Sequence, residues 1–258
     1  MPHGESWFSL LPLHERFLAF ARIFSKPFNE DGLTWYAHEQ PGVQHIYAAL
    51  FVLGILVIVA VTTETSIHNS AGNLVPPATL TIRNFVELLV GACLKMMSDI
   101  MGPEAARKFL PLIGTCAFFI LFSNALGLVP GFLPPTSNFN TTFGMGLVIF
   151  CATHIYGLKV NGFNHIKHLF GPIWWLAPLM FVIEVISHVA RPVSLGIRLM
   201  ANMTADHMVL SIFLGLVPFL VPLPMYVLGT IVVVVQALVF SLLSTVYIAM
   251  AIEPAEHH

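Results

Sequence analysis

Apolar residues occupy the chain in long uninterrupted runs that shorter polar segments separate. The first run, 46–63, carries no charged residue and is long enough to cross a bilayer as a helix. The region 109–158 also carries no Lys, Arg, Asp or Glu, and it is long enough for two spans. A Pro- and Gly-rich break at 130–135 divides it. The pattern therefore predicts a helical hairpin of 109–129 and 142–158.

Two further apolar runs follow towards the C-terminus. As one helix, the run 172–212 would be about 60 Å long, whereas the hydrocarbon core of a bilayer is about 30 Å thick. The helix must therefore tilt strongly, kink at Pro178 or Pro192, or lie partly along the membrane surface. Prolines at 218, 222 and 224 predict a turn, which 225–252 follows as the last long apolar helix.

The segment 79–100 differs from the spans because polar residues recur in it at helical spacing. These residues are Asn84, Glu87, Gly91, Lys95 and Ser98. One polar stripe on an apolar helix is typical of a helix at the membrane interface. The alternative is a span whose polar face packs against neighbouring helices. The charged residues of the segment favour the interface, because they are many for a span.

These elements together predict an all-α polytopic membrane protein. An extramembrane arm, 1–44, precedes a membrane domain, 45–252, and a tail, 253–258, ends the chain. The spans are expected at about 46–63, 109–129, 142–158, 173–212 and 225–252. Lys and Arg occur in the connections 64–108 and 159–171 but not in the turns 130–141 and 213–224. The positive-inside rule therefore places the N-terminus outside and the C-terminus in the cytoplasm.

Composition supports this assignment and limits the classes of function. The chain is 57% hydrophobic and 9% charged, whereas soluble domains carry roughly 25% charged residues. Its 11 basic and 13 acidic residues leave no basic surface for nucleic acid. Its three cysteines form neither a CxxC pair nor a disulfide framework, and no nucleotide, zinc-protease or serine-hydrolase motif is present. We therefore expect ion passage, without a catalytic site, cofactor or metal in this chain.

Arg198 is the residue that most needs a function, because an arginine at the centre of a span costs between about 2.5–3.5 and 10–17 kcal/mol. No carboxylate lies three or four residues from it in either direction. Ser194 and Asn202 share its helix face and can form hydrogen bonds, but they cannot neutralise it. The counter-charge must therefore come from another helix or another subunit, unless Arg198 extends to the interface as an ordinary snorkelling side chain.

The remaining ionisable residues of the same run leave alternatives open. Glu184 and Arg191 lie on roughly the face of Arg198, and they either pair with each other or line a water-filled path. His207 can exchange protons near neutral pH, and the adjacent Asp206 can do the same or pair with it.

Three further polar residues stand alone in apolar surroundings, and each can be explained by hydrogen bonding within the protein. Gln236, the only amide of its helix, either meets Arg198 or a water chain, or bonds between helices for packing. His154 and His188 are expected to be hydrogen-bonded core residues.

Several stretches resemble the a subunit of F-type ATP synthases over about 45–252. They are NALGLVPG at 124–131, PPTSNFNTT at 134–142 and, most specifically, RPVSLGIRLMAN at 191–202, with QALVF at 236–240 and VYIAMA at 246–251. The resemblance implies two long tilted helices, about 173–212 and 225–252, against a rotating ring of c subunits. It also implies a bacterial inner-membrane protein that couples proton flow to ATP synthesis, with the b-subunit peripheral stalk and the rest of the complex as partners.

The resemblance further assigns roles to single residues. Arg198 matches the arginine that faces the proton-carrying carboxylate of the ring, and Asn202 and Gln236 match polar residues near it. Glu184, Ser194 and His207 match positions of the two half-channels: Glu184 and Ser194 towards the cytoplasm, and His207 on the outer side.

Two positions depart from the family pattern. Gly229 stands where some members carry an ionisable partner of the His207 position, and Asp206 stands where many have a small residue. The outer proton relay is therefore either His207 alone or His207 with Asp206. A sodium-coupled version of the same subunit, an ion-coupled secondary transporter and a purely structural membrane subunit are the alternatives. The chain shows no internal repeat of the kind that many transporters have.

Overall fold

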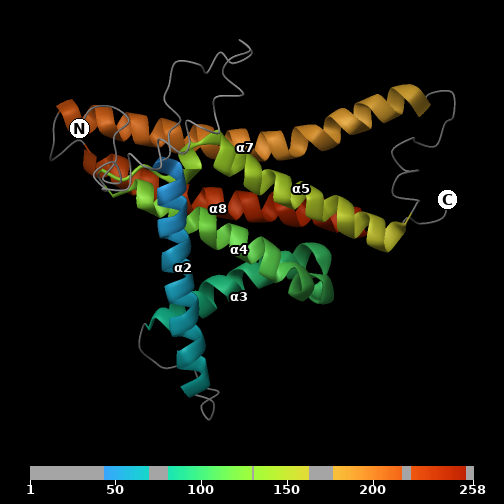
Figure 1. Cartoon of the computed structure of the whole chain (residues 1–258), viewed down its shortest axis with the longest axis horizontal. Helices are drawn as coiled ribbons and strands as arrows, with labels where there is room; N and C mark the ends of the chain where they lie inside the picture. Colours follow the sequence, from blue (N-terminus) through green and yellow to red (C-terminus); the bar gives the residue numbers. More distant parts are fainter. Residues whose placement is uncertain (1–43, 70–80, 130, 163–176, 217–221, 254–258) are drawn as a thin grey trace, which may run out of the picture.

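The computed structural model describes residues 44–69, 81–129, 131–162, 177–216 and 222–253, and every regular element in these ranges is helical (Figure 1). The elements are α2 (Gln44–Asn69), α3 (Ile82–Met101), α4 (Pro103–Gly127), the short 3-10 helix η2 (Pro135–Ser137), α5 (Phe139–Asn161), α7 (Ala177–Leu216) and α8 (Pro222–Ile252). Five of them, α2, α4, α5, α7 and α8, are long and apolar enough to cross a membrane. The predicted all-α polytopic fold is confirmed, and α3 is not among the candidate spans.

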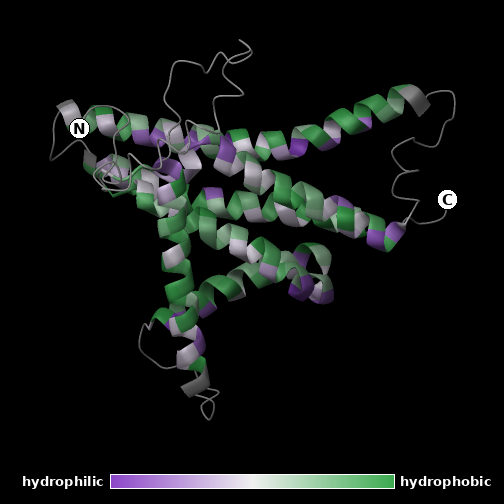
Figure 2. Ribbon diagram, viewed as in Figure 1, coloured by the Kyte–Doolittle hydropathy of each residue, from purple (hydrophilic) through white to green (hydrophobic). Residues whose placement is uncertain are grey.

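The helices form one bundle in which α4, α5, α7 and α8 run lengthwise, and α2 crosses them steeply (Figure 1). Helix α5 packs on α7 and α8, α4 packs on α8 and α3, and α2 lies against α3, α4 and η2. Apolar colour covers most of the helical surface in Figure 2, and polar residues gather at the start of α4 and at the end of α5. A surface so apolar requires lipid or another subunit over much of its area.

Helix α7 resolves the length problem by remaining one helix of 40 residues that contains Pro192 and bends along its course (Figure 1). A proline inside a helix removes one backbone hydrogen bond and favours a bend. At about 1.5 Å per residue the helix is about 60 Å long. It must therefore lie strongly inclined to the bilayer normal if its apolar length is to stay within lipid.

Two predicted boundaries are wrong in an instructive way. The first predicted span ends at residue 63, whereas α2 continues to Asn69. The hydroxyls of Thr62, Thr63 and Thr65 donate to carbonyl oxygens one turn back, at 2.7–2.9 Å, which satisfies these polar groups within the helix. The prolines at 222 and 224 do not form the predicted turn, because they belong to the first turn of α8. A proline there loses no helical hydrogen bond.

Other helices begin earlier than their apolar runs. Helix α4 starts at Pro103 rather than at 109, since Gly102, with φ of 81°, ends α3 in a conformation that favours glycine. Helix α5 starts at Phe139 rather than at 142, because the side chain of Asn138 accepts a hydrogen bond from the backbone N–H of Asn140 and caps the helix. The predicted arm up to residue 43, the tail from residue 254, and Pro218 lie outside the described residues.

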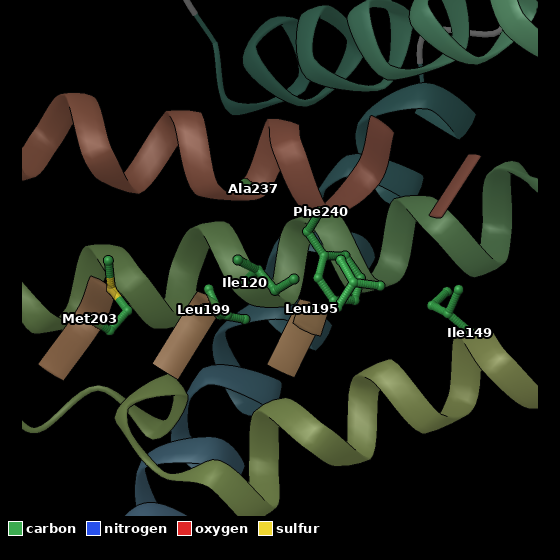
Figure 3. Packing of buried hydrophobic residues seen from close by; sticks show 7 residues of the cluster. All are labelled: Ile120, Ile149, Leu195, Leu199, Met203, Ala237 and Phe240. Atoms are coloured by element: carbon green, nitrogen blue, oxygen red, sulfur yellow. The ribbon is translucent and has the colours of Figure 1, made fainter. Parts of the chain in front are cut away.

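An apolar cluster at the centre of the bundle joins four helices (Figure 3). It consists of Ile120 of α4, Ile149 of α5, Leu195, Leu199 and Met203 of α7, and Ala237 and Phe240 of α8. Helices α5 and α7 approach closely at two glycines. A Cβ atom at Gly146 would lie 2.8 Å from the carbonyl oxygen of Pro192, and one at Gly196 would lie 3.1 Å from Cα of Phe143. This packing fixes α7 relative to the other helices.

Candidate functional site

Arg198 lies near the middle of α7 and is exposed on the surface of the bundle. Within the described ranges its guanidinium makes no ion pair and no hydrogen bond. The exposed residues beside it on α7 are mostly small, namely Ala190, Ser194, Ala201 and Ala205, at spacings of three or four residues. A second helix can approach such a strip closely. The absence of an ionic partner for Arg198 among the described residues agrees with the lack of a local counter-charge that the sequence predicts.

Asp206 and His207 line a small hollow that α4 and α8 complete. Neighbours in sequence usually point to different sides of a helix, yet both residues contribute to this one hollow. Nδ1 of His207 is buried and has no hydrogen-bond partner in the described part of the chain. No ion pair joins Asp206 to His207 there. Gly229 also lines the hollow, where a Cβ atom would lie 2.9 Å from the side chain of Leu128.

Asn124 of α4 lies in the wall of the same hollow and was not among the predicted site residues. It is 1% exposed, and its Oδ1 atom accepts a hydrogen bond of 2.6 Å from the hydroxyl of Thr136. Its amide nitrogen Nδ2 is buried without a partner among the described residues. A buried polar group that lacks a hydrogen bond costs about 1–3 kcal/mol, and a water molecule in the hollow would remove this cost for Nδ2.

A second hollow lies on the other side of Arg198, between α5, α7 and α8. His154, His188, Arg191 and Tyr247 contribute to its lining. Arg191 does not pair with Glu184 in the described structure. Its guanidinium carbon lies 5.2 Å from the centre of the Tyr247 ring, a cation–π contact. Glu184 instead lies beside His188, with 3.4 Å between Oε1 and Nδ1.

The central apolar cluster stands between the two hollows. Met203 lines the hollow of His207, and Leu195 lines the hollow of Arg191. Leu199, which is 2% exposed, lies between them on the buried face of α7 (Figure 3). Along the helix, His207 lies about 13 Å from Arg198 in one direction, and His188 about 15 Å in the other. The interior therefore carries ionisable side chains on both sides of the Arg198 level, and the cluster of apolar side chains lies between them.

The amides of Asn202 and Gln236 stand at the edge of this central region. Gln236 is 9% exposed and precedes Ala237 of the apolar cluster, whereas Asn202 is half-buried and follows Arg198 by one turn. No hydrogen bond joins Gln236 to Arg198 within the described ranges. Ser194 is exposed one turn before Arg198. The described residues contain no group of three or more His, Cys, Asp or Glu that could hold a metal ion.

Comparison with known proteins is consistent with this arrangement. The family model described as ATP synthase A chain matches residues 45–249. An ATP synthase subunit a of Sorangium cellulosum (strain So ce56) is 44% identical over 96% of this chain and 100% of that protein. The ATP synthase subunit a of Geobacter sulfurreducens is 46% identical over 78% of this chain and 86% of its own length. That of Trichlorobacter lovleyi is 53% identical over 67% of this chain and 75% of its own.

Proposed function

The chain belongs to the ATP synthase A chain family, and from this starting point we propose that it provides the proton path to and from a ring of c subunits. The chain is thus a subunit of the membrane sector FO of ATP synthase, and its relatives are bacterial. Family membership decides against an independent secondary transporter. The proposed partners are the c ring, the b-subunit peripheral stalk and the other subunits of the complex.

The observation that carries the proposal is the position of Arg198. The guanidinium is always protonated, it is exposed on α7, and it has no ionic partner in the described part of the chain. The small residues beside it would allow a helix of a neighbouring subunit to come close. A carboxylate on that helix would lose its proton when it passes Arg198, because the nearby positive charge favours the ionised form. The ring would supply this carboxylate.

The two hollows support two separate half-channels. We assign the hollow of Asp206 and His207 to the outer half-channel, with His207 as the proton acceptor and Asp206 beside it. Glu184, Arg191 and Ser194 belong to the cytoplasmic half-channel. Asn202 and Gln236 supply hydrogen-bonding groups near Arg198.

The apolar cluster between the hollows supports the coupling of proton flow to rotation. Protons that cannot pass through the apolar interior must travel on the ring. A fixed positive charge also repels a free hydronium ion. One charge that moves through 100 mV releases about 2.3 kcal/mol, which then drives rotation instead of a leak.

The orientation follows from the basic residues. Lys159 lies at the end of α5, and Arg107 and Lys108 lie in the first turns of α4. The positive-inside rule places these ends in the cytoplasm. The N-terminus then lies outside, the C-terminus lies inside, and the protein is a multi-pass subunit of the bacterial inner membrane.

The choice between protons and sodium ions is tested with the purified complex in liposomes. We expect ATP hydrolysis to acidify the lumen at the same rate with and without added sodium chloride, and a protonophore to abolish the signal. Uptake of sodium that the protonophore accelerates would support the sodium-coupled alternative. His207→Gln in the same complex should strongly reduce acidification while ATP hydrolysis continues, because glutamine cannot carry a proton at that position.

A further inference from the structure

Two histidines from different helices meet on the Glu184 side of Arg198. The ring centres of His154 on α5 and His188 on α7 lie 5.3 Å apart, with 71° between the ring planes. Both rings line the second hollow and are half-buried. Titratable residues inside spans are rare and usually serve a function. The sequence suggested two unrelated core residues, whereas the fold brings them together.

The hydrogen bonds of both rings define which nitrogen accepts a proton. Nδ1 of His154 lies 2.9 Å from the carbonyl oxygen of Phe150, and Nδ1 of His188 lies 2.9 Å from that of Glu184. A carbonyl oxygen only accepts, so Nδ1 of each ring carries a hydrogen and donates it. In the neutral ring the lone pair is then on Nε2, which is the atom that takes a further proton.

Charged groups of opposite sign face the histidine pair. Oε1 of Glu184 lies 3.4 Å from Nδ1 of His188, and the side chain of Glu184 is 36% exposed, against 15% for His188. Arg191 and Tyr247 line the hollow from α7 and α8, and they contact each other. The pair therefore lies between a carboxylate, which can take up a proton, and a guanidinium, which stays protonated.

We propose that His154 and His188 form a proton relay between this hollow and the carboxylate of Glu184. The relay deepens the proposed function and rests on it. Towards the cytoplasm, a proton binds Nε2 of a neutral ring and gives an imidazolium. The Nδ1–H group of the His188 imidazolium, which lies 3.4 Å from Oε1, then passes its proton to the Glu184 carboxylate, which becomes a carboxylic acid and releases the proton to bulk water. One proton enters and one leaves. The ring is left with its hydrogen on Nε2, and exchange of this proton with water in the hollow restores the Nδ1–H form before the next transfer.

The course of α7 leaves the side chain of Glu184 partly uncovered. The first turns of α7 diverge from α5 (Figure 1), and the Glu184 side chain is 36% exposed. His188 lies at the start of the fourth turn of the helix, between these first turns and the apolar cluster. The relay would therefore bridge the buried hollow and the partly exposed Glu184 side chain.

The test is ATP-driven proton pumping by the whole complex in inverted membrane vesicles, whose outer medium corresponds to the cytoplasm. The variant is His154→Gln/His188→Gln, since glutamine keeps hydrogen-bonding groups but cannot carry a proton. Pumping and ATP hydrolysis are measured together while the medium pH is raised from about 6.5 to about 8.5, across the range in which histidine binds protons. A site that captures protons matters most when free protons are scarce. We therefore expect a near-normal ratio of pumping to hydrolysis at the acidic limit and a ratio about tenfold lower at the alkaline limit.

His45→Gln is the matched control. His45 also meets a side chain from another part of the chain, with 3.4 Å between its Nδ1 and Nδ2 of Asn138, the residue that caps the opposite end of α5. This variant should keep the wild-type pH profile. A wild-type profile in the double variant overturns the relay, and so does a loss of pumping that is equal at every pH, because damaged packing has that effect. If the double variant fails to assemble, His188→Gln alone is measured against the same two outcomes.

Arg198→Ala in the same vesicles separates failure of the relay from failure of the proposed function. Normal pumping by Arg198→Ala overturns the proposed function. Abolished pumping by Arg198→Ala, together with a wild-type pH profile in the histidine variant, overturns the relay alone.

Discussion

Gly146→Ala tests whether the contact between α5 and α7 positions the arginine-bearing helix. The new Cβ atom would stand 2.8 Å from the carbonyl oxygen of Pro192. This neighbour is backbone, so the helices must separate by several tenths of an ångström. Forcing an extra methyl group into a packed interior costs typically about 1–3 kcal/mol. The same change gains up to about 1 kcal/mol of helix propensity, which offsets part of the cost.

Gly144→Ala is the control for the gain in helix propensity that any glycine-to-alanine change in this helix brings. Gly144 lies in the same helix two residues earlier, and a Cβ atom there would meet nothing within 4 Å. The two variants share the gain in propensity, so their difference isolates the clash, about 1–3 kcal/mol. We expect Gly146→Ala to lower the temperature at which the subunit leaves the purified complex, and to lower the ratio of proton pumping to ATP hydrolysis. If both variants behave alike, the close approach of α5 and α7 does not position Arg198.

Three further changes test the described packing, each by the heat stability of the purified complex. Leu199→Ala should destabilise it by about 2–5 kcal/mol, because this side chain is 2% exposed at the centre of the apolar cluster; a loss below about 1 kcal/mol would mean that the cluster is loosely packed. Thr136→Val should cost about 1–3 kcal/mol, because it leaves Oδ1 of Asn124 without its donor; an unchanged stability would show that water replaces the hydroxyl. Asn138→Ala should cost about 0.5–2 kcal/mol through loss of the cap of α5, and Asn138→Asp, which keeps an acceptor, should restore most of it.

The sequence predicted the helices well where hydrophobicity alone determines their position. The charge-free runs became α2, α4, α5 and α8, and the excess length of the run from 172 appears as one helix of 40 residues, α7. Boundaries failed where polar residues belong to helices. The threonines at the end of α2 satisfy their hydroxyls on their own helix, and the prolines at 222 and 224 fit the first turn of α8. Hydropathy does not register either effect.

The candidate site was predictable only as far as single residues within one helix allow. The isolation of Arg198 follows from the residues one turn away on either side. The choice of Tyr247 instead of Glu184 as the neighbour of Arg191 depends on packing between α7 and α8. The meeting of His154 and His188 depends on packing between α5 and α7. No local pattern contains these contacts, because they join residues far apart in the chain.

The most direct test of the account compares Arg198→Ala with wild type in inverted membrane vesicles that contain the whole complex. Ile197→Ala, at an adjacent exposed position of α7, is the control for removal of a large side chain. The account predicts that Arg198→Ala abolishes ATP-driven proton pumping while the complex assembles and hydrolyses ATP, and that Ile197→Ala pumps. Near-normal pumping by an assembled Arg198→Ala complex would contradict the central claim that this charge couples proton flow to the ring.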